Sequence, residues 1–363
     1  MNLLPPDDSG DRFALGGAPF WPVDHLAEPS AWVGHIPFAF WVVDALRPRR
    51  LVELGTHSGN SYFAFAQAVQ RLGLDTACFA VDTWQGDAHA RHYGEDVFEA
   101  VSRYHDGRYG AFSRLVRSTF EDAVQHFPDG SIDLLHVDGC HTYEAVAHDV
   151  EGWRPKLSTR AVVLLHDINV REGDFGAWRL WAELCGRYPH FEFLHAHGLG
   201  VLGVGSEQPP ALVALWQAAR DATRVGRIRD AFARLGSSVV ERMQLEAHVR
   251  AVESQVEGLS VAMRTAHEAV ARGAEGRASL EEALWVRDRE ITQHVRQIHW
   301  LQQEIVRLGQ RVEHERADRV AEVAALQAEL SAVYGSRSWR LVRPLRQGVS
   351  WYRAARGRSR PAP

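Results

Sequence analysis

A short apolar run that ends in an acid and opens into a glycine-spaced turn, LVELGTHSGNS (Leu51–Ser61), constrains the fold of this chain more than any other stretch. The apolar run has the length of a buried strand. Gly55 and Gly59 follow where the chain must turn tightly and a ligand can approach the backbone. The same strand-then-loop pattern recurs as far as Gly205, which predicts one domain built around this turn.

The recurring apolar runs alternate with segments of helical spacing. The expected strands are Leu51–Leu54, Cys78–Val81, Phe112–Arg117, Ile132–Val137 and Ala161–Leu165, with two closing strands in Phe191–Gly205. The expected helices are Trp32–Leu46, Tyr62–Leu72, Tyr143–Trp153 and Phe175–Tyr188, and Thr83–Tyr109 is an insertion without a strong period. This alternation predicts an α/β fold, a doubly wound parallel sheet with helices on both faces.

The expected strand ends share an acidic side chain. These acids are Glu53, Asp82, Asp138 and Asp167. Ligands of doubly wound sheets collect at the carboxyl ends of the strands, near the point where the strand order reverses. Acids on apolar strands would otherwise need internal partners, so a ligand site is predicted at this edge of the sheet.

The 363 residues exceed one typical domain, and the chain changes character along its length. The expected parts are a flexible N-terminal arm (1–30), the α/β domain (31–206), a helical connector (207–244), a coiled coil (245–334) and a basic aromatic tail (335–363). The tail segment Arg337–Arg360 contains eight arginines and no acid. We expect either peripheral contact with an anionic membrane surface or a disordered basic tail.

The coiled coil is predicted from two apolar series in one seven-residue register. The first series is Val249, Val256, Met263, Val270, Leu284, Ile291, Ile298, Ile305, Val312 and Leu326, and the second is Val252, Leu259, Ala266, Leu280, Leu301 and Leu308. Interleaved series of this kind predict a left-handed coiled coil and hence a homo-oligomer. Gly273 and Gly276 weaken its middle, and one long helix folded back on the α/β domain is the alternative.

Composition narrows the class of protein. The formal net charge of −5 gives no basic signal, so we expect no nucleic-acid partner. Three widely spaced cysteines fit a reducing compartment better than disulfides or a cysteine-based zinc site. We expect a cytoplasmic protein, because no signal-peptide pattern opens the chain and no run of 18 apolar residues occurs.

The turn has an ExGxxxG arrangement that lacks the paired glycines of a dinucleotide fingerprint, which disfavours a nicotinamide cofactor. It resembles the first motif of class I S-adenosylmethionine-dependent methyltransferases, which have a Rossmann-like fold. The motifs VELGTHSGNSYFAF, AVDTWQGD, DLLHVDGCHTYEAVAHDVEGWRPKL, VVLLHDI and HGLGVLGVG resemble the small-molecule methyltransferases found among bacterial polysaccharide and glycosyltransferase gene products. The segment SRSWRLVRPLR also resembles one that recurs in bacterial surface-polysaccharide glycosyltransferases.

The resemblance implies a methyl donor, S-adenosylmethionine, and a set of residues that bind it. These residues are Glu53, Gly55, Thr56 and Gly59 near the methionine moiety, Asp82 at the ribose, and Ser118 with Thr119 and Phe120 near the adenine. The expected reaction is methyl transfer to a hydroxyl of a small molecule or glycan, with a sugar of a bacterial surface polysaccharide as the expected acceptor.

Asp138 and Asp167 end neighbouring strands and resemble the acid pair of catechol-type, magnesium-dependent O-methyltransferases. That likeness implies that they hold Mg²⁺ or another divalent cation, or else the acceptor. His141 stands where that family has a lysine base and is expected to be the catalytic base, acting with Asp138. A histidine with a pKa of about 6.5 accepts a proton near neutral pH.

The third metal ligand of that family falls at Ile168, which cannot bind a cation, so Asn169 or Asp149 would have to replace it. Hydrogen bonds could instead satisfy both carboxylates.

Two other functions compete with this one. His136 and Asp138 form an HxD pair that occurs in non-haem iron oxygenases. A non-catalytic assembly protein with a vestigial methyltransferase domain is the other alternative.

Overall fold

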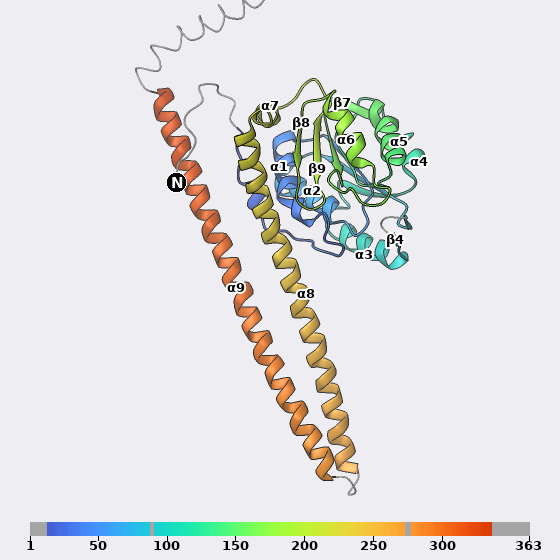
Figure 1. Cartoon of the computed structure of the whole chain (residues 1–363), viewed down its shortest axis with the longest axis vertical. Helices are drawn as coiled ribbons and strands as arrows, with labels where there is room; N and C mark the ends of the chain where they lie inside the picture. The colour runs from blue at the N-terminus through green and yellow to red at the C-terminus, as the bar shows by residue number, and fades with distance from the viewer. Residues whose placement is uncertain (1–12, 88–90, 273–276, 336–363) are drawn as a thin grey trace, which may run out of the picture. The chain divides into compact units, whose positions relative to one another are not determined.

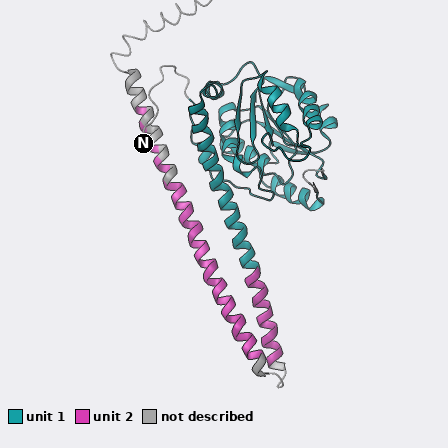
Figure 2. Ribbon diagram, viewed as in Figure 1, with its two compact units in different colours: residues 1–254 teal, residues 255–363 magenta. Residues whose placement is uncertain are grey.

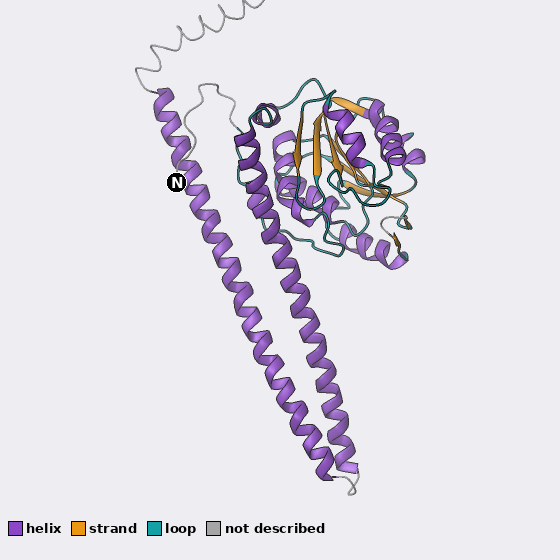
Figure 3. Ribbon diagram, viewed as in Figure 1, coloured by secondary structure: helices purple, strands orange, loops and turns teal. Residues whose placement is uncertain are grey.

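The computed structural model describes residues 13–87, 91–272 and 277–335. The chain divides into two compact units, residues 1–254 and residues 255–363 (Figure 2). The first unit contains the sheet, and the described part of the second is helical (Figure 3).

Seven strands form one twisted sheet in the first unit (Figure 1). Their order is β5 (Ser113–Arg117), β2 (Ala77–Asp82), β1 (Arg50–Leu54), β6 (Ile132–Val137), β7 (Leu157–His166), β9 (Leu199–Gly203) and β8 (His190–Phe193). The strands from β5 to β7 are parallel, whereas β9 runs antiparallel to both of its neighbours. The doubly wound sheet and its closing strand pair are confirmed, and the sheet is mixed because of that pair.

The strand order reverses between β1 and β6, since the chain first builds β2 and β5 on one side of β1 and later β6 and β7 on the other. Alternate side chains of the strands enter two cores. Leu134 packs with α1 (Ile36–Leu46) and α2 (Asn60–Arg71) on one face. Leu135 packs on the other face, with α4 (Phe120–Val124), α5 (Tyr143–Trp153) and α6 (Ala177–Cys185). Helices on both faces are thus confirmed.

The expectation of a flexible arm over residues 1–30 is wrong for its described part, residues 13–30. This segment includes the short helix η1 (Ala18–Phe20) and is fastened to α2 by two buried amides. Asn60 bonds the backbone of Ala27 and Pro29, and Gln67 bonds Asp24 N and Pro22 O. Side chains of α2 hold the backbone of this segment, so its own sequence needs no apolar period to be ordered.

The insertion expected over Thr83–Tyr109 is also more regular than its pattern indicates. It contains a hairpin of β3 (Gly86–Asp87) and β4 (Arg91–His92), then α3 (Glu95–Asp106). Two acids in the first turn favour the helix. Val97, Val101 and Tyr104 recur at helical spacing on it, so the sequence carried a helical signal that the expectation of an irregular insertion overlooked.

The helical connector continues the α/β core. Leu215 of α7 (Pro210–Ala218) and Phe232 and Met243 of α8 (Ala222–Arg272) are buried in the core that contains α1. The first unit therefore extends to residue 254, beyond the domain boundary expected at 206.

The single long helix considered as an alternative is not observed, because α8 ends at Arg272 and α9 (Arg277–Gly335) begins after the glycine-containing stretch 273–276. The coiled coil and the homo-oligomer stay predictions. The basic aromatic tail lies outside the described residues except for Gly335. Within the described ranges, no helix combines the length and apolarity needed to cross a membrane.

Candidate active site

The glycine turn after β1 is held by the end of β6. Gly55 has φ +86°, and a Cβ at this position would lie 2.1 Å from the carbonyl oxygen of Asp138. Gly59 also has φ +86°, and its added Cβ would meet the Phe63 ring. Both positions therefore require glycine, and the turn brings β1 against the residue that follows β6.

Asp82 fixes the other side of this turn. Its Oδ2 accepts hydrogen bonds from Thr56 N at 2.8 Å and His57 N at 2.9 Å, and its Oδ1 accepts one from Trp84 N at 2.7 Å. An ionised carboxylate has about four acceptor sites, so Asp82 holds the turn and keeps capacity for one more donor. The ribose contact expected of Asp82 stays a prediction.

A cavity of about 230 Å³ lies between the turn and the end of β6. Its lining includes Gly55 and Asp82 together with Asp138 and His141, so these predicted site residues meet here. The remaining lining residues are His57, Thr83, Gly86, Tyr93, Thr119, Phe120, Gly139 and Cys140. Thr56, Gly59 and Ser118 are absent from the lining, although Thr119 and Phe120, expected near the adenine, belong to it.

Glu53 faces away from this cavity. Its buried carboxylate accepts a 2.8 Å hydrogen bond from His136 Nδ1, and His136 Nε2 accepts one from the Trp32 indole at 3.0 Å. Burial raises the pKa of Glu53. Both nitrogens of His136 are thus engaged inside the core, which contradicts the iron site that paired His136 with Asp138.

The carboxylate of Asp167 joins two histidines. His141 Nε2 lies 3.1 Å from its Oδ2, and His197 Nδ1 lies 3.1 Å from its Oδ1. The His141 ring also stacks on Phe175 at 5.2 Å. Since an ionised carboxylate only accepts, His141 carries a proton on Nε2 and, when neutral, a lone pair on Nδ1.

Asp138 pairs with a third histidine. His166 Nδ1 lies 3.0 Å from Asp138 Oδ1, and His166 Nε2 lies 3.0 Å from Ala196 O. Both partners accept, so the two hydrogen bonds form together only when the ring is doubly protonated. Although burial opposes the charge, Asp138 and Asp167 raise the pKa of His166 to about 9. Burial opposes ionisation of Asp138 too, but the neighbouring histidines hold its pKa well below the usual range.

This ion pair predicts a pH-dependent stability. The pKa of His166 rises from about 6.5 on folding, so its contribution is complete below that pH and is lost as the pH rises through about 9. The melting temperature should therefore fall over that interval in the wild type and fall less in His166→Gln. Calorimetric melts at a series of pH values measure this, and parallel profiles would contradict the charged pair.

Backbone strain concentrates around the same site. In the described residues, all non-glycine residues with positive φ except Arg47 border it: His57, Trp84, Asp167, Ala196 and His197. Such conformations cost about 1–3 kcal/mol each and persist where function requires them. Here the strained loop before β9 aims Ala196 O at His166 and places His197 beside Asp167.

The structure also brings together a set of metal donors. Ligand atoms of Asp138, His141 and Asp167 lie within 4.8 Å of one another. Asn169, the expected replacement ligand, instead donates to Leu194 O, and Asp149 is absent from this group. His141 is therefore the third potential ligand.

Sequence reasoning missed His57, Tyr93 and His197. His57 and Tyr93 contact each other edge-on at 4.4 Å between ring centroids and line the cavity. His197 opens the motif HGLGVLGVG, but its pairing with Asp167 depends on the loop before β9. The motif could have drawn attention to His197, but it contains no information about the pairing with Asp167.

A curated relative matches more than half of this chain. The chain is 51% identical over 217 residues to the uncharacterized protein y4gI of Sinorhizobium fredii, a match that covers 60% of this chain and 24% of that protein. The chain thus spans about a quarter of the length of this curated relative.

Solved structures with some likeness include three methyltransferases. The SAH-bound methyltransferase PaMTH1 of Podospora anserina shares 14% identity over 46% of this chain and 76% of that chain, with a TM-score of 0.36. A putative caffeoyl-CoA O-methyltransferase of Staphylococcus aureus shares 12% identity over 49% of this chain and 84% of that chain, with a TM-score of 0.37. The O-methyltransferase TomG of Streptomyces achromogenes shares 14% identity over 50% of this chain and 82% of that chain, with a TM-score of 0.36.

A family model described as a methyltransferase domain matches residues 52–168. The matched segment contains the glycine turn, Asp82, Asp138, His141 and Asp167. Residues 52–168 of this chain are therefore similar to the methyltransferase-domain family.

Proposed function

We propose that the first unit is an S-adenosylmethionine-dependent O-methyltransferase. One observation carries this proposal: a single cavity is lined by the glycine turn and Asp82 at one end and by Asp138 and His141 at the other. The donor supplies an electrophilic methyl group on a sulfonium. A hydroxyl oxygen then forms a bond to the methyl carbon, the carbon–sulfur bond breaks, and the hydroxyl proton must leave.

His141 is proposed as the base that takes this proton. Its Nε2 lies 3.1 Å from the Asp167 carboxylate, which favours the tautomer with Nδ1 as the accepting atom and stabilises the imidazolium that forms. His197 supports Asp167 from the other side. Asp138, held ionised by His166, is proposed to accept a hydrogen bond from the acceptor substrate.

The donor end of the cavity fits a nucleoside. Phe120 and Tyr93 supply aromatic walls, and Asp82 is the acid beside the turn.

Donor binding is the first test. Titration of the full chain with S-adenosylmethionine in a calorimeter should show saturable binding. Asp82→Ala should weaken it at least about 30-fold, because two turn N–H groups lose a charged acceptor worth roughly 1.5–3 kcal/mol per hydrogen bond. Asp75→Ala, an acid with no such contact in the described structure, is the matched control.

The same titration separates the enzyme from the non-catalytic assembly protein. A wild-type chain that binds no donor would favour the assembly protein with a vestigial domain. Binding that Asp82→Ala leaves unchanged would place the donor elsewhere.

A divalent cation held by the acid and histidine cluster is the alternative to His141 acting as the base. Two carboxylates and one imidazole suit Mn²⁺ or Mg²⁺. When bound, the ion would be held by Asp138, Asp167 and His141, and it would lower the pKa of the acceptor hydroxyl. His141 would then act as a ligand rather than as the base.

Metal binding can be measured without turnover. Electron paramagnetic resonance of free Mn²⁺ should show one ion taken up by the full chain and none by Asp167→Asn. Asp149→Asn should retain the ion, because Asp149 lies outside the cluster. Absence of uptake by the wild type would remove the cation from the proposal.

The proposed acceptor is a sugar hydroxyl of a bacterial surface polysaccharide or glycoconjugate. Support comes from the motif resemblance and from the segment SRSWRLVRPLR. Transfer of a labelled methyl group from the donor to a cell-surface glycan fraction tests this class. Label that appears only in small-molecule fractions would redirect the proposal to another hydroxyl.

A further inference from the structure

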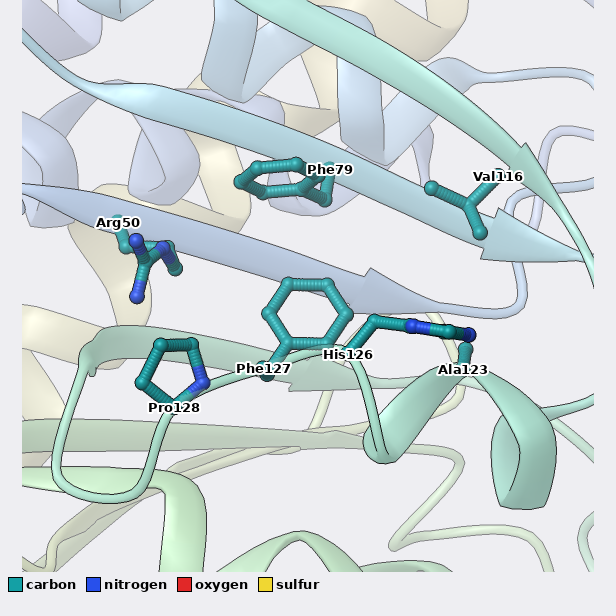
Figure 4. Close-up of a pocket in the computed structure, with 7 residues that line it drawn as sticks. All are labelled: Arg50, Phe79, Val116, Ala123, His126, Phe127 and Pro128. Carbon is teal, nitrogen blue, oxygen red and sulfur yellow. The ribbon is translucent and has the colours of Figure 1, made fainter.

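A second cavity, of about 210 Å³, lies on the sheet face that carries α4 and shares no lining residue with the donor cavity. Figure 4 shows its lining residues, which lie on strands of the sheet, on α4 and on the loop after it. Arg50, Phe79 and Val116 come from β1, β2 and β5, and Ala123, His126, Phe127 and Pro128 come from α4 and the loop.

The cavity exists because α4 is too short to cover its part of the sheet. A helix of five residues is about 7.5 Å long, whereas β2, with six residues, extends about 20 Å. Phe79 and Val116 consequently stay half-buried. The Phe79 and Phe127 rings meet edge-on at 5.1 Å and form an aromatic wall.

One charged group borders this apolar space. Arg50 Nε is buried and has no hydrogen-bond partner among the described residues. The preceding Arg49 differs, since its guanidinium bonds both oxygens of Asp133. Nε is covered by protein atoms, so the rest of the guanidinium is the part available to a ligand, and a carboxylate bound in the cavity would give this charge a partner through a fork-shaped pair of hydrogen bonds.

We propose that this cavity binds a small organic carboxylate with an aromatic body. The carboxylate bonds the Arg50 guanidinium, and the ring packs against Phe79 and Phe127 in the edge-on geometry that aromatic groups prefer. The size is suitable, because an apolar cavity of about 150 Å³ accommodates benzene. The site is independent of methyl transfer, since it lies apart from Asp82 and His141.

Benzoate is the probe, and saturation-transfer NMR with the full chain is the measurement. Benzoate should bind with a Kd of about 1 mM, a value expected for a ligand of this few atoms. Arg50→Gln should weaken benzoate about tenfold and leave the neutral analogue benzyl alcohol unchanged, because only the charged hydrogen bonds are lost. Arg50→Lys, which keeps the charge, should bind benzoate more tightly than Arg50→Gln does.

Two further variants separate this site from the rest of the surface. Val116→Phe should abolish binding of both probes by filling the cavity. Arg47→Gln removes an exposed arginine that pairs with Asp44, and it should bind benzoate like the wild type. No saturable binding by the wild type, equal benzoate affinity in Arg50→Gln, or binding retained in Val116→Phe would each overturn the proposal.

Discussion

Replacement of His141 with alanine should lower the rate of methyl transfer about 10²–10⁴-fold, the range by which a general base contributes to catalysis. The affinity for S-adenosylmethionine should stay within about twofold, because the lost group acts on the acceptor proton. The physical reason is the 3.1 Å contact between His141 Nε2 and the Asp167 carboxylate, which favours the tautomer with Nδ1 as the proton acceptor. Initial rates with saturating donor measure the effect.

His148→Ala is the matched control for this experiment. His148 also lies on the segment after β6, but its side chain is 63% exposed and pairs with Glu121. Its loss should leave the rate unchanged. A His141→Ala chain that keeps the wild-type rate across the pH range would remove His141 from the mechanism, whereas a rate lost together with donor binding would indicate a structural role.

The sheet was predictable because each strand is a local apolar run. Ile132–Val137 is buried along its whole length and was expected with the same bounds. The segment before α1 was not predictable, because it is ordered by Asn60 and Gln67, which lie more than 30 residues away. α3 was missed although it has an apolar face, since Val97, Val101 and Tyr104 recur on it at helical spacing among polar residues.

Part of the candidate site could be predicted from the sequence. The rule that ligands gather at strand ends placed Asp82 and Asp138 at one cavity, as expected from the reversal of strand order. The same rule failed for Glu53, because its side chain turns into the core toward His136. Histidine pairings such as His197 with Asp167 join loops far apart in the chain, so local patterns carry no information about them.

Gly55→Ala should be the most destabilising single substitution at the turn, with a loss of more than about 4 kcal/mol in the free energy of unfolding. Two costs combine at this position. The residue has φ +86°, which an L side chain rarely adopts, and the new Cβ would lie 2.1 Å from the carbonyl oxygen of Asp138. That oxygen belongs to the backbone and cannot rotate away, so either the turn or the end of β6 must move.

Gly73→Ala separates these two costs. Gly73 also has a positive φ, +59°, but nothing lies within 4 Å of the position of its added Cβ. Its substitution should therefore cost only about 1–2 kcal/mol, the price of a left-handed residue with a side chain. Urea unfolding of both full-length variants, followed by tryptophan fluorescence, measures the difference. Equal losses would mean that Gly55 is required for its dihedral angles alone and that the contact between the turn and β6 does not hold the site together.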